Sequence, residues 1–569
     1  MLTRRAFIEA TTIGDLVDRA ASQRTGDAVV FPGERVTFPE LAALTDDYAA
    51  SLHALGVEPG EKVGILMPNR LEFIAALVGA AKLGAIVVPI NGRFREYELG
   101  HVVCHADIRV LLTAAGPGGA ADYPGLLAGM LPALSAQDPA RLELAGQPRL
   151  RQIVDLGSSG HAGFLTADAF HDARRGVDLA EIRARQQCVR IRDIALLMYT
   201  SGTTSHPKGC LLTHEAVVRH GINVARSRFS MTEDDRFWDP LPLFHIGGIV
   251  PLLGCLGIGA TYCHAGHFDA DVSLDMLVRE RCTVLYPAFE TIWLAVLYHP
   301  RFDARDLDSV RLIQNIAVPE RLRQMQELLP GAAQVSSYGA TECSSNLTLP
   351  LPDDPEDVRI GTLGPVVPGM QLKIVDPETR AELPPGEVGE LAFRGYARFE
   401  GYYKDPKLTA SVVDEEGWFY SADLASVDEA GRLVYGGRLK DMLKVGGENV
   451  SALEVEGFIL THEAVQIAQV VGAPDARYVE VPAAFVQLRE GARLGEQELI
   501  NYCTGRIASF KVPRYVRFVD DWPMSGTKIQ KFLLRERIQL ELAERGVVEA
   551  PRIEARSHRS AAPSAETRP

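Results

Sequence analysis

The chain has 569 residues, which is too long for a single hydrophobic core, so several domains or subdomains are expected. Hydrophobic residues make up 46% of the chain and charged residues 23%, a composition that is ordinary for a globular enzyme. The formal net charge of -15 disfavours nucleic acid and anionic membrane surfaces as main partners, although loops and helix ends can still bind phosphate.

The eight cysteines are spread over the chain without a CxxC pair. This spacing indicates neither a disulfide framework nor a zinc site, and it favours reduced thiols that fill gaps in the core. Residues 1–20 hold three arginines but no continuous apolar run, so we expect no signal peptide. The expected location is therefore the cytoplasm.

Helices and strands alternate along the first part of the chain. Apolar residues at helical spacing predict a helix over Glu40–Leu55, and a second, more buried helix is expected over Leu71–Leu83. The apolar run Ile86–Ile90 then predicts a buried strand. The same order recurs where the predicted helix Val272–Arg281 leads into the strand Thr283–Tyr286. Such alternation is typical of α/β layers with buried sheets.

The segment Ile246–Cys263 carries no charged residue. It also contains Pro251 and several glycines, so a buried core segment fits it better than a membrane span.

From about Gln371 short strands with turn residues predict a smaller β-rich region, for example over Gln371–Val375 and Gly389–Arg394. After Arg438 the pattern indicates a small separate α/β domain. Its expected elements are a helix near Leu453–Leu460, strands near Val465–Val471 and Ala483–Leu488, a helix near Glu496–Ala508, and a strand near Tyr515–Val519.

These patterns predict an α/β fold with a large N-terminal domain over residues 1–437. That domain would contain layered α/β subdomains and the β-rich subdomain, and a small α+β C-terminal domain would follow over residues 438–535. Residues 536–569 would form a C-terminal tail. The end of this tail, from about Pro551, is rich in Ala, Ser, Arg and Pro and is expected to be disordered.

The segment Tyr199–Gly209 (YTSGTTSHPKG) follows the strand-like run Ile194–Met198. Hydroxyl side chains cluster there around Gly202, and Lys208 follows a proline. Hydroxyls and free backbone amides bind phosphate oxygens, and a lysine adds a charge-assisted hydrogen bond. The lysine is followed by Gly209, so this is not the Walker spacing. By itself the segment fits a polar turn as well as it fits a phosphate loop.

The loop resembles the phosphate loop of the adenylate-forming superfamily, which includes acyl-CoA synthetases, peptide-synthetase adenylation domains and firefly luciferase. Further matches follow in the family's order across nearly the whole chain. They are the aromatic-His motif Phe244-His245-Ile246-Gly247-Gly248, the YGxTE motif Tyr338–Glu342, GELxxRG at Gly389–Gly395, YxTGD at Tyr420–Asp423, the hinge and glycine loop at Gly437–Asn449, and a last lysine, Lys528. The acyl-CoA synthetase branch is the one that the chain resembles.

The resemblance implies a role for each match in the attack of a carboxylate on the α-phosphorus of ATP. Charge builds on phosphate oxygens in such a step, so cations and donors must already be in place. Thr200, Ser201, Gly202, Thr203, Thr204 and Lys208 would hold the leaving phosphates, Thr341 would bind a phosphate oxygen, and Glu342 would bind Mg²⁺. Tyr338 with Gly339, and Ala317, would lie beside adenine, Asp423 would bind the ribose, and Arg438 would reach ribose or phosphate. Lys528 would bridge the substrate carboxylate and the α-phosphate.

In the family the small domain is mobile and rotates between the two steps. Lys440 occupies the hinge position, where a few residues absorb large dihedral changes. The rotation would remove Lys528 and bring in Lys444 with the Gly446-Gly447 loop, which lets the pantetheine arm of coenzyme A pass close to backbone.

The chain departs from the family pattern at four places. Ser205 and Ala422 stand where relatives have glycine. The motif Pro523–Lys528 is one residue shorter than usual, so Lys531 is an alternative for the last lysine. The segment Gln314–Pro319 lacks the usual glycine pair, and Ile316 there could narrow or reshape the acyl pocket.

His245 is expected beside the acyl pocket. The pocket itself would be lined by Trp238, Ile246, Gly247, Phe289, Asn315 and Ile316, a largely apolar set that suits a medium-chain, branched or cyclic acid. No acidic residue falls within Ile246–Ile258, which argues against an α-amino acid substrate.

The leading hypothesis is therefore an ATP-dependent, AMP-forming carboxylate–CoA ligase that uses ATP, Mg²⁺ and coenzyme A. An enzyme that loads a carrier protein instead of CoA, and a nucleotide-binding pseudoenzyme, remain as alternatives. The intact Lys440–Asn449 segment argues against the first alternative, and the retained motif residues argue against the second. The sequence indicates no oligomeric state.

Overall fold

The computed structural model describes residues 10–116, 121–157, 159–200, 207–439, 442–445, 448–525 and 528–552. For Lys444, Glu448, Asn449, Ser525 and Lys528 the description covers the backbone alone. By its contacts the chain divides into two units. The first holds residues 10–317, 321–421 and 426–434, and the second holds the described residues from Tyr435 onward together with 318–320 and 422–425.

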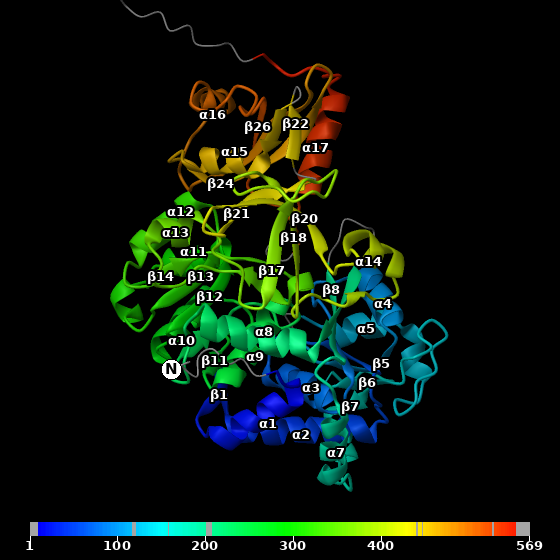
Figure 1. Cartoon of the computed structure of the whole chain (residues 1–569). Coiled ribbons are helices and arrows are strands. Elements are labelled where there is room, and N and C mark those ends of the chain that lie inside the picture. The colour runs from blue at the N-terminus through cyan, green and yellow to red at the C-terminus, as the bar shows by residue number, and fades with distance from the viewer. Residues whose placement is uncertain are drawn as a thin grey trace, which may run out of the picture. The chain divides into compact units, whose positions relative to one another are not determined.

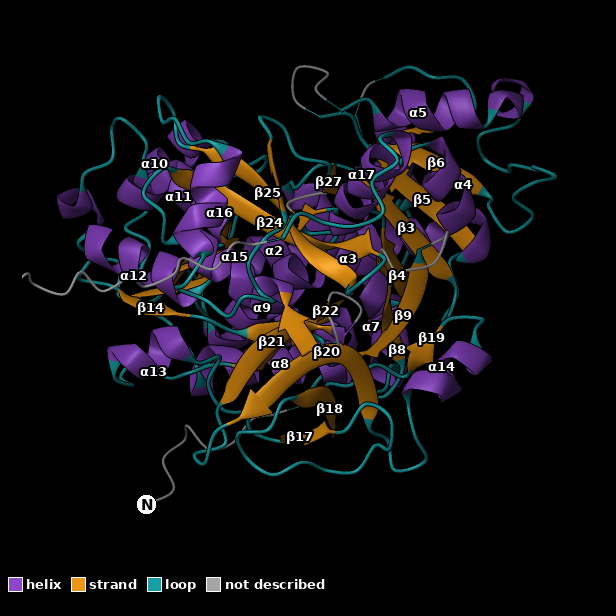
Figure 2. Cartoon of the chain, turned by 90° about the horizontal axis from the view of Figure 1, so that it is seen from above, coloured by secondary structure: helices purple, strands orange, loops and turns teal. Residues whose placement is uncertain are grey.

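Within the described residues, the first unit has an eight-stranded sheet in the order β19-β9-β8-β4-β3-β5-β6-β7. Its strands are β3 (Lys62–Leu66), β4 (Ile86–Pro89), β5 (Ile108–Thr113), β6 (Gln152–Asp155), β7 (Leu165–Thr166), β8 (Ile194–Thr200), β9 (Lys208–Thr213) and β19 (Gly401–Tyr402). The strands from β8 to β7 pair in parallel, whereas β9 and β19 add an antiparallel edge. Figure 2 shows β4, β3, β5 and β6 as neighbours in this order.

A seven-stranded sheet in the order β14-β13-β12-β10-β11-β1-β2 is the second large layer of the same unit, again counted over described residues. Its strands are β1 (Asp27–Phe31), β2 (Glu34–Thr37), β10 (Arg236–Trp238), β11 (Thr261–Cys263), β12 (Val284–Phe289), β13 (Leu312–Ile316) and β14 (Ala333–Val335). All neighbours pair in parallel except β1 with β2. Strands of this kind, buried on both faces, are rich in apolar residues, and β12 is buried along nearly its whole length.

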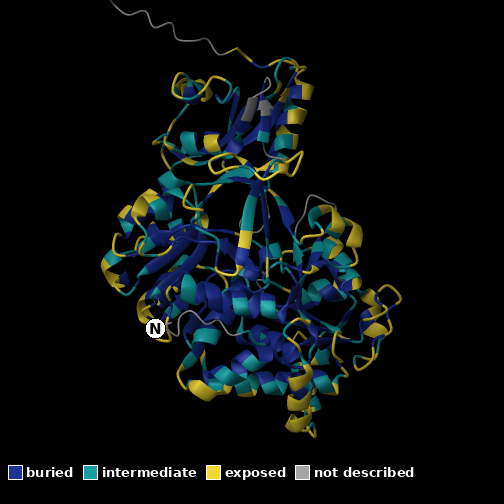
Figure 3. Ribbon diagram, viewed as in Figure 1, coloured by how far each residue is buried: buried dark blue, intermediate teal, exposed yellow. Residues whose placement is uncertain are grey.

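Helices α1, α2, α3, α8 and α9 contact one another and form a continuous layer (Figure 1). The helices preceding β22 are α1 (Ile13–Gln23), α2 (Phe38–Ala54), α3 (Leu71–Lys82), α4 (Glu96–His105), α5 (Tyr123–Met130), α6 (Ala167–Ala173), α7 (Leu179–Cys188), α8 (His214–Ser227), α9 (Ile246–Ile258), α10 (Ala270–Arg279), α11 (Glu290–Leu297), α12 (Pro319–Leu328), α13 (Glu356–Gly361) and α14 (Pro406–Val412). Helices α8 and α9 approach closely at Gly221 and Gly254, where an added Cβ on either glycine would lie 2.5–2.6 Å from a backbone oxygen of the other helix. Both helices and the strands of the large sheets are mostly buried (Figure 3).

Two smaller sheets complete this part of the chain. The hairpin of β15 (Tyr338–Ala340) and β16 (Ser345–Thr348) surrounds a 3₁₀ turn over Thr341–Cys343. The four-stranded sheet has the order β17-β18-β20-β21, with β17 (Met370–Val375), β18 (Gly389–Gly395), β20 (Phe419–Val427) and β21 (Leu433–Arg438). The predicted β-rich region is therefore present.

The second unit is α+β. Its elements are β22 (Met442–Val445), β23 (Glu448–Ser451), α15 (Ala452–Leu460), β24 (Val465–Asp475), β25 (Val479–Leu488), α16 (Glu496–Cys503), β26 (Tyr515–Phe518), β27 (Met524–Ser525), β28 (Lys528–Ile529) and α17 (Lys531–Glu544). Leu443, Val455, Val470 and Val486 belong to its core, which buries one side of the sheet. The predicted helix Glu496–Ala508 is shorter in the structure, because the backbone turns away after Cys503.

The uncharged segment Ile246–Cys263 forms the buried helix α9, with Pro251 inside it, followed by strand β11. Among the described residues, no helix combines the length and apolar character needed to cross a bilayer.

Candidate active site

The predicted acyl-pocket residues lie at the carboxyl ends of neighbouring parallel strands. Trp238 ends β10, Phe289 ends β12 and Ile316 ends β13, while Ile246 and Gly247 begin helix α9. Phe289 and Ile316 are direct register partners. Carboxyl ends of parallel strands meet at one edge of a sheet, which is where α/β proteins bind ligands.

Asn315 and Ile316 point to opposite faces of β13, because successive side chains alternate along a strand. Asn315 is fully buried, and its Nδ2 atom lies 3.0 Å from the Sδ atom of Met325 on α12. The Ile316 side chain is 42% exposed. Of the two, Ile316 is the one that presents an apolar surface at the strand ends.

His245 occupies the N-cap position of α9 and is exposed. Its ring centroid lies 4.7 Å from that of Phe244. Its side chain makes no hydrogen bond that caps the helix. The imidazole is therefore exposed at the start of α9.

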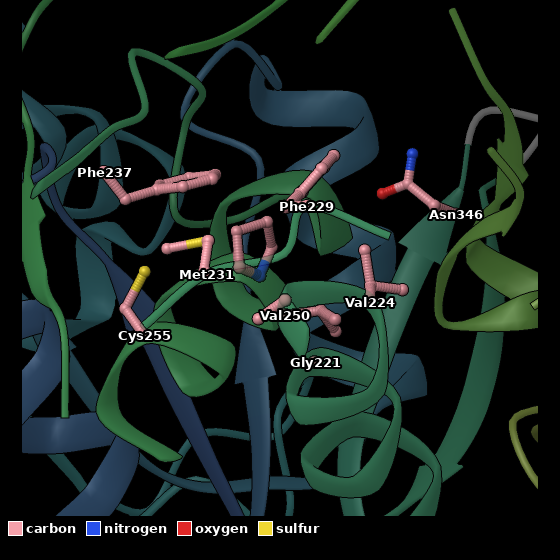
Figure 4. A pocket seen from close by; sticks show the side chains of 10 residues that line it. Gly221, Val224, Phe229, Met231, Phe237, Val250, Cys255 and Asn346 are labelled. Carbon is pink, nitrogen blue, oxygen red and sulfur yellow. The ribbon is translucent and has the colours of Figure 1, made fainter. Parts of the chain in front are cut away.

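A cavity of about 10 Å³, roughly the room of one water molecule, lies between α8 and α9. Phe229, Met231, Phe237 and Cys255 contribute apolar walls, and Asn346 contributes an amide (Figure 4). Its described lining contains none of the six predicted acyl-pocket residues.

The YGATE motif forms a tight turn. Thr341 and Glu342 lie on the 3₁₀ turn between β15 and β16, and Ser344 and Ser345 follow it with φ angles of +58° and +102°. Gly339 packs against β16 so closely that an added Cβ would lie 2.2 Å from the Ser345 carbonyl oxygen. Such backbone persists only where its surroundings hold it in place, as at binding sites.

A buried polar network supports this turn from behind. Asn346 Nδ2 donates to Ser337 Oγ at 2.8 Å, and the Tyr286 hydroxyl donates to Asn346 Oδ1 at 2.9 Å. His220 Nε2 lies 2.7 Å from the Asn346 carbonyl oxygen, and burial lowers the pKa of His220 to about 4, so its ring is neutral and donates. Tyr338, which precedes the turn, is 7% exposed.

The phosphate-loop candidate spans the connection of an antiparallel hairpin. Thr200 ends β8, Lys208 begins β9, and the two are register partners. The loop residues Ser201, Gly202, Thr203, Thr204 and Ser205 lie outside the described residues. The hairpin places both described ends of the loop together, as a phosphate loop requires.

Lys208 and Glu342 both lie beside Tyr402 of β19. The Tyr402 hydroxyl donates to Glu342 Oε1 at 2.9 Å, and Lys208 Nζ lies 5.5 Å from the centroid of the Tyr402 ring. Burial and the Glu342 carboxylate raise the pKa of Tyr402, so its phenol remains protonated. Burial, followed by the Glu342 charge, also raises the pKa of the Cys210 thiol, which leaves it uncharged.

In the second unit, Asp423 and Arg438 form an ion pair with 3.1 Å between Oδ1 and Nε. The Tyr435 hydroxyl lies 3.4 Å from the same carboxylate oxygen. Asp423 is buried and Arg438 is exposed. The preceding residue, Ala422, has a φ angle of +58°, the conformation that glycine adopts at no cost.

The two candidates for the last lysine differ in their surroundings. Lys528 begins β28 and pairs with Ser525 across a tight hairpin, and its side chain lies outside the description. Lys531 Nζ lies 2.5 Å from Glu456 Oε1, and this buried carboxylate also accepts from the Val470 N–H at 2.6 Å. Lys531 is thus held by its own unit, which favours the assignment to Lys528.

The remaining predicted residues of the second unit are described in part. Lys444 pairs with Asn449 in the β22–β23 hairpin, whereas Lys440, Gly446 and Gly447 lie outside the described residues. Ala317 directly follows β13.

Two residues beside the predicted site carry no prediction from the sequence. Tyr402 lies in Gly401-Tyr402-Tyr403, between two matched motifs, and it contacts a carboxylate 60 residues away. Tyr435 lies two residues before the hinge motif that begins at Gly437. Both are aromatic residues near matched motifs, and this proximity is the signal in the sequence that could have identified them.

The described residues contain no group of three or more His, Cys, Asp or Glu side chains arranged to hold a metal ion. A Mg²⁺ ion held by one carboxylate and substrate phosphates does not need such a group. Glu342 supplies a hard oxygen ligand, and the hydroxyl of Thr341 is adjacent in the chain, so the residues present fit this ion.

Two family profiles match the chain. The AMP-binding enzyme family matches residues 17–403, and the AMP-binding enzyme C-terminal domain matches residues 454–528. YngI of Bacillus subtilis, named as an acyl-CoA synthetase, is 35% identical over 93% of this chain and 97% of its own length. The mouse medium-chain acyl-CoA ligase ACSF2 is 30% identical over 94% of this chain and 88% of its own.

The structure of the anthranilate CoA ligase AuaEII in complex with anthranoyl-AMP matches with a TM-score of 0.83 and 27% identity. The match covers 95% of this chain and 100% of that one. The predicted α/β fold with a large N-terminal and a small C-terminal domain is confirmed by these matches, as is the resemblance that the motifs indicated. The chain therefore belongs to the AMP-binding enzyme family, in its acyl-CoA synthetase branch, whose members are AMP-forming acid–thiol ligases that use ATP and CoA.

Proposed function

We propose that this protein converts a carboxylic acid and ATP into an acyl-adenylate and pyrophosphate, and then transfers the acyl group to the thiol of CoA with release of AMP. The observation that carries this proposal is that Lys208 and Glu342 both lie beside Tyr402. A cation and a carboxylate close together suit the phosphates of ATP and a divalent ion. The parallel strand ends of the same unit then offer an apolar edge for the acid.

The first step needs no protein nucleophile or base, because the substrate carboxylate is already ionised. One oxygen of that carboxylate attacks the α-phosphorus while the bond to pyrophosphate breaks. Lys208 stabilises charge on the leaving phosphates through a charge-assisted hydrogen bond, and Thr341 donates to a phosphate oxygen. Lys528 would bridge the two approaching anions.

Glu342 would hold Mg²⁺, which neutralises phosphate charge when it is bound. The ribose would bind at Asp423, whose carboxylate accepts hydrogen bonds from hydroxyl groups. Arg438 already pairs with Asp423, so it would hold the carboxylate in place. Tyr338 would offer its ring to adenine.

For the second step we propose that residues 438–535 form a domain that turns about Lys440. The turn would exchange Lys528 for Lys444 and the Gly446-Gly447 loop. The short β22–β23 hairpin supports this proposal, because its two strands flank Gly446 and Gly447 in the sequence, and glycines let a pantetheine arm pass close to backbone.

The acid would be medium-chain, branched or cyclic. The exposed Ile316, with Phe289 opposite in register, supports an apolar substrate. The names of two relatives agree with this range of acids. ACSF2 is named as a medium-chain acyl-CoA ligase, and the AuaEII structure holds anthranoyl-AMP, an aromatic acyl-adenylate. A carrier protein as the acceptor is not favoured, because ACSF2 and AuaEII are both named as CoA ligases.

The test is to incubate the protein with ATP, MgCl₂ and straight-chain, branched and aromatic acids, with and without CoA. We expect AMP, pyrophosphate and a thioester that forms only when CoA is present. Acyl-adenylate that accumulates without thioester would support the carrier-protein alternative. No turnover with any acid, despite ATP binding, would support a nucleotide-binding pseudoenzyme.

A further inference from the structure

The segment from Phe399 to Tyr403 joins the Glu342 turn to the strand that carries Lys208. The Phe399 N–H donates to the Glu342 carbonyl oxygen at 2.8 Å. Gly401 and Tyr402 then pair with β9, with Tyr402 opposite Cys210, and the Tyr403 N–H donates to the Gly209 carbonyl oxygen at 2.8 Å. The backbone alone therefore fixes the distance between the two halves of the phosphate site.

The Tyr402 side chain completes this connection. Its hydroxyl donates to Glu342 Oε1, and its ring lies edge-on to the fully buried ring of Phe399, with 4.9 Å between centroids. Because the Tyr402 ring packs against the buried ring of Phe399, the phenol has little rotational freedom. Glu342, by contrast, has three rotatable side-chain bonds and needs a partner to keep its carboxylate in one orientation.

We propose that Tyr402 is a positioning residue for the divalent cation: it holds one oxygen of Glu342 and so directs the other toward the metal. This inference rests on the proposed role of Glu342 as a Mg²⁺ ligand. Groups that hydrogen-bond a ligating carboxylate orient it, and their loss typically weakens metal binding by about 10- to 100-fold. Tyr402 itself touches neither the metal nor the reacting atoms.

The chain offers a matched control next to this tyrosine. Tyr403 directly follows β19, and its hydroxyl donates to Asp107 Oδ2 at 2.8 Å. Tyr403→Phe therefore removes the same atom, from a neighbouring tyrosine in the same segment, without touching Glu342.

The experiment measures metal binding at equilibrium, so it does not depend on turnover. The full-length protein is saturated with α,β-methylene-ATP, whose α–β bond cannot be cleaved as ATP is, and is titrated with Mn²⁺ while the free ion is read by electron paramagnetic resonance. Mg²⁺ is then measured by competition. We expect Tyr402→Phe to raise the dissociation constant for Mn²⁺ by about 10-fold or more, and Tyr403→Phe to leave it unchanged.

Three results would overturn the inference, and Glu342→Gln helps to separate them. If Glu342→Gln weakens Mn²⁺ binding but Tyr402→Phe does not, Tyr402 has no positioning role, while the proposed function stands. If Tyr402→Phe and Tyr403→Phe weaken binding equally, the effect is a general loosening of the segment. If Glu342→Gln itself has no effect, Glu342 is not the metal ligand, and the proposed site fails together with this inference.

Discussion

Ala422 holds a backbone conformation that its side chain disfavours. Its φ angle of +58° lies in the left-handed region, and the residue directly precedes the buried carboxylate of Asp423. The sequence marks this position because relatives have glycine there. Only the structure supplies the reason, since a sequence motif carries no dihedral angle.

We predict that Ala422→Gly stabilises the protein by about 0.5–1 kcal/mol. The left-handed conformation costs an alanine about 1–2 kcal/mol, and the greater freedom of glycine in the unfolded chain offsets part of the gain. Urea unfolding of the two proteins measures the difference. Ala425→Gly, at a buried alanine of the same strand, should instead lower stability, and a loss of stability in Ala422→Gly would contradict the prediction.

Lys528 and Lys531 can be separated by half-reactions. We expect Lys528→Ala to stop formation of acyl-adenylate from acid and ATP, yet to spare thioester formation from supplied acyl-adenylate and CoA, because the bridging cation is needed only in the first step. Lys531→Ala should retain adenylation. Its loss leaves Glu456 buried without its cation, so it should lower the free energy of unfolding by about 1–3 kcal/mol.

Rapid-quench assays of each half-reaction, with urea unfolding of both variants, decide between the lysines. Adenylation lost in a stably folded Lys531→Ala, and retained in Lys528→Ala, would reverse the assignment.

At the scale of elements, a single buried lysine connects several helices of the first unit. Lys82 of α3 is fully buried, and its Nζ atom bonds Asp18 of α1 at 2.7 Å and also Asp46 of α2. Gln186 of α7 donates to Asp18 at 2.8 Å. An apolar residue pattern predicts α3, but it does not explain why a lysine lies on its inner face; the carboxylates of α1 and α2 do.

We therefore predict that Lys82→Met destabilises the protein by about 2–4 kcal/mol, because two partly buried carboxylates lose their cation. Guanidinium unfolding measures the change. Lys407→Met, at an exposed position of α14, is the control and should stay within about 0.5 kcal/mol of the parent. Equal effects in the two variants would show that the buried ion pairs contribute nothing specific.

Element boundaries were predicted less well than the elements themselves. Helix α2 begins at Phe38, earlier than the expected Glu40, because Thr37 caps it and Glu40 completes the capping box. The Thr-x-x-Glu spacing is readable in the sequence. The early end of α16 is not, since it depends on how the following residues contact their own unit.

At the scale of the whole molecule, three buried histidines bear on acid stability. His214, His220 and His264 are each shifted by burial from an ordinary pKa of 6.5 to about 4. His264 illustrates the neutral form, since its Nε2 lies 2.9 Å from the Leu241 carbonyl oxygen and its Nδ1 accepts from the Gly266 N–H at 2.8 Å. The folded protein therefore leaves these rings unprotonated where the unfolded chain would protonate them.

We predict that stability is full above about pH 6.5 and is lost as the pH falls toward 4, because the unfolded chain takes up protons in that window and the folded chain does not. By about pH 5, each histidine would lower the free energy of unfolding by about 2 kcal/mol. Urea midpoints between about pH 7 and pH 5 test this. His220→Gln should make the decline less steep, and an unchanged slope would contradict the role of this histidine.

The sequence by itself determined the family and the α/β class, and it predicted the site residues, because short motifs of fixed spacing carry the resemblance to the family. Only the tertiary structure showed which side chains from distant segments contact one another. Tyr402 meets Glu342, Lys531 meets Glu456, and Lys82 meets Asp18 only after distant segments fold together. Such contacts depend on strand register and helix packing, which no local spacing encodes.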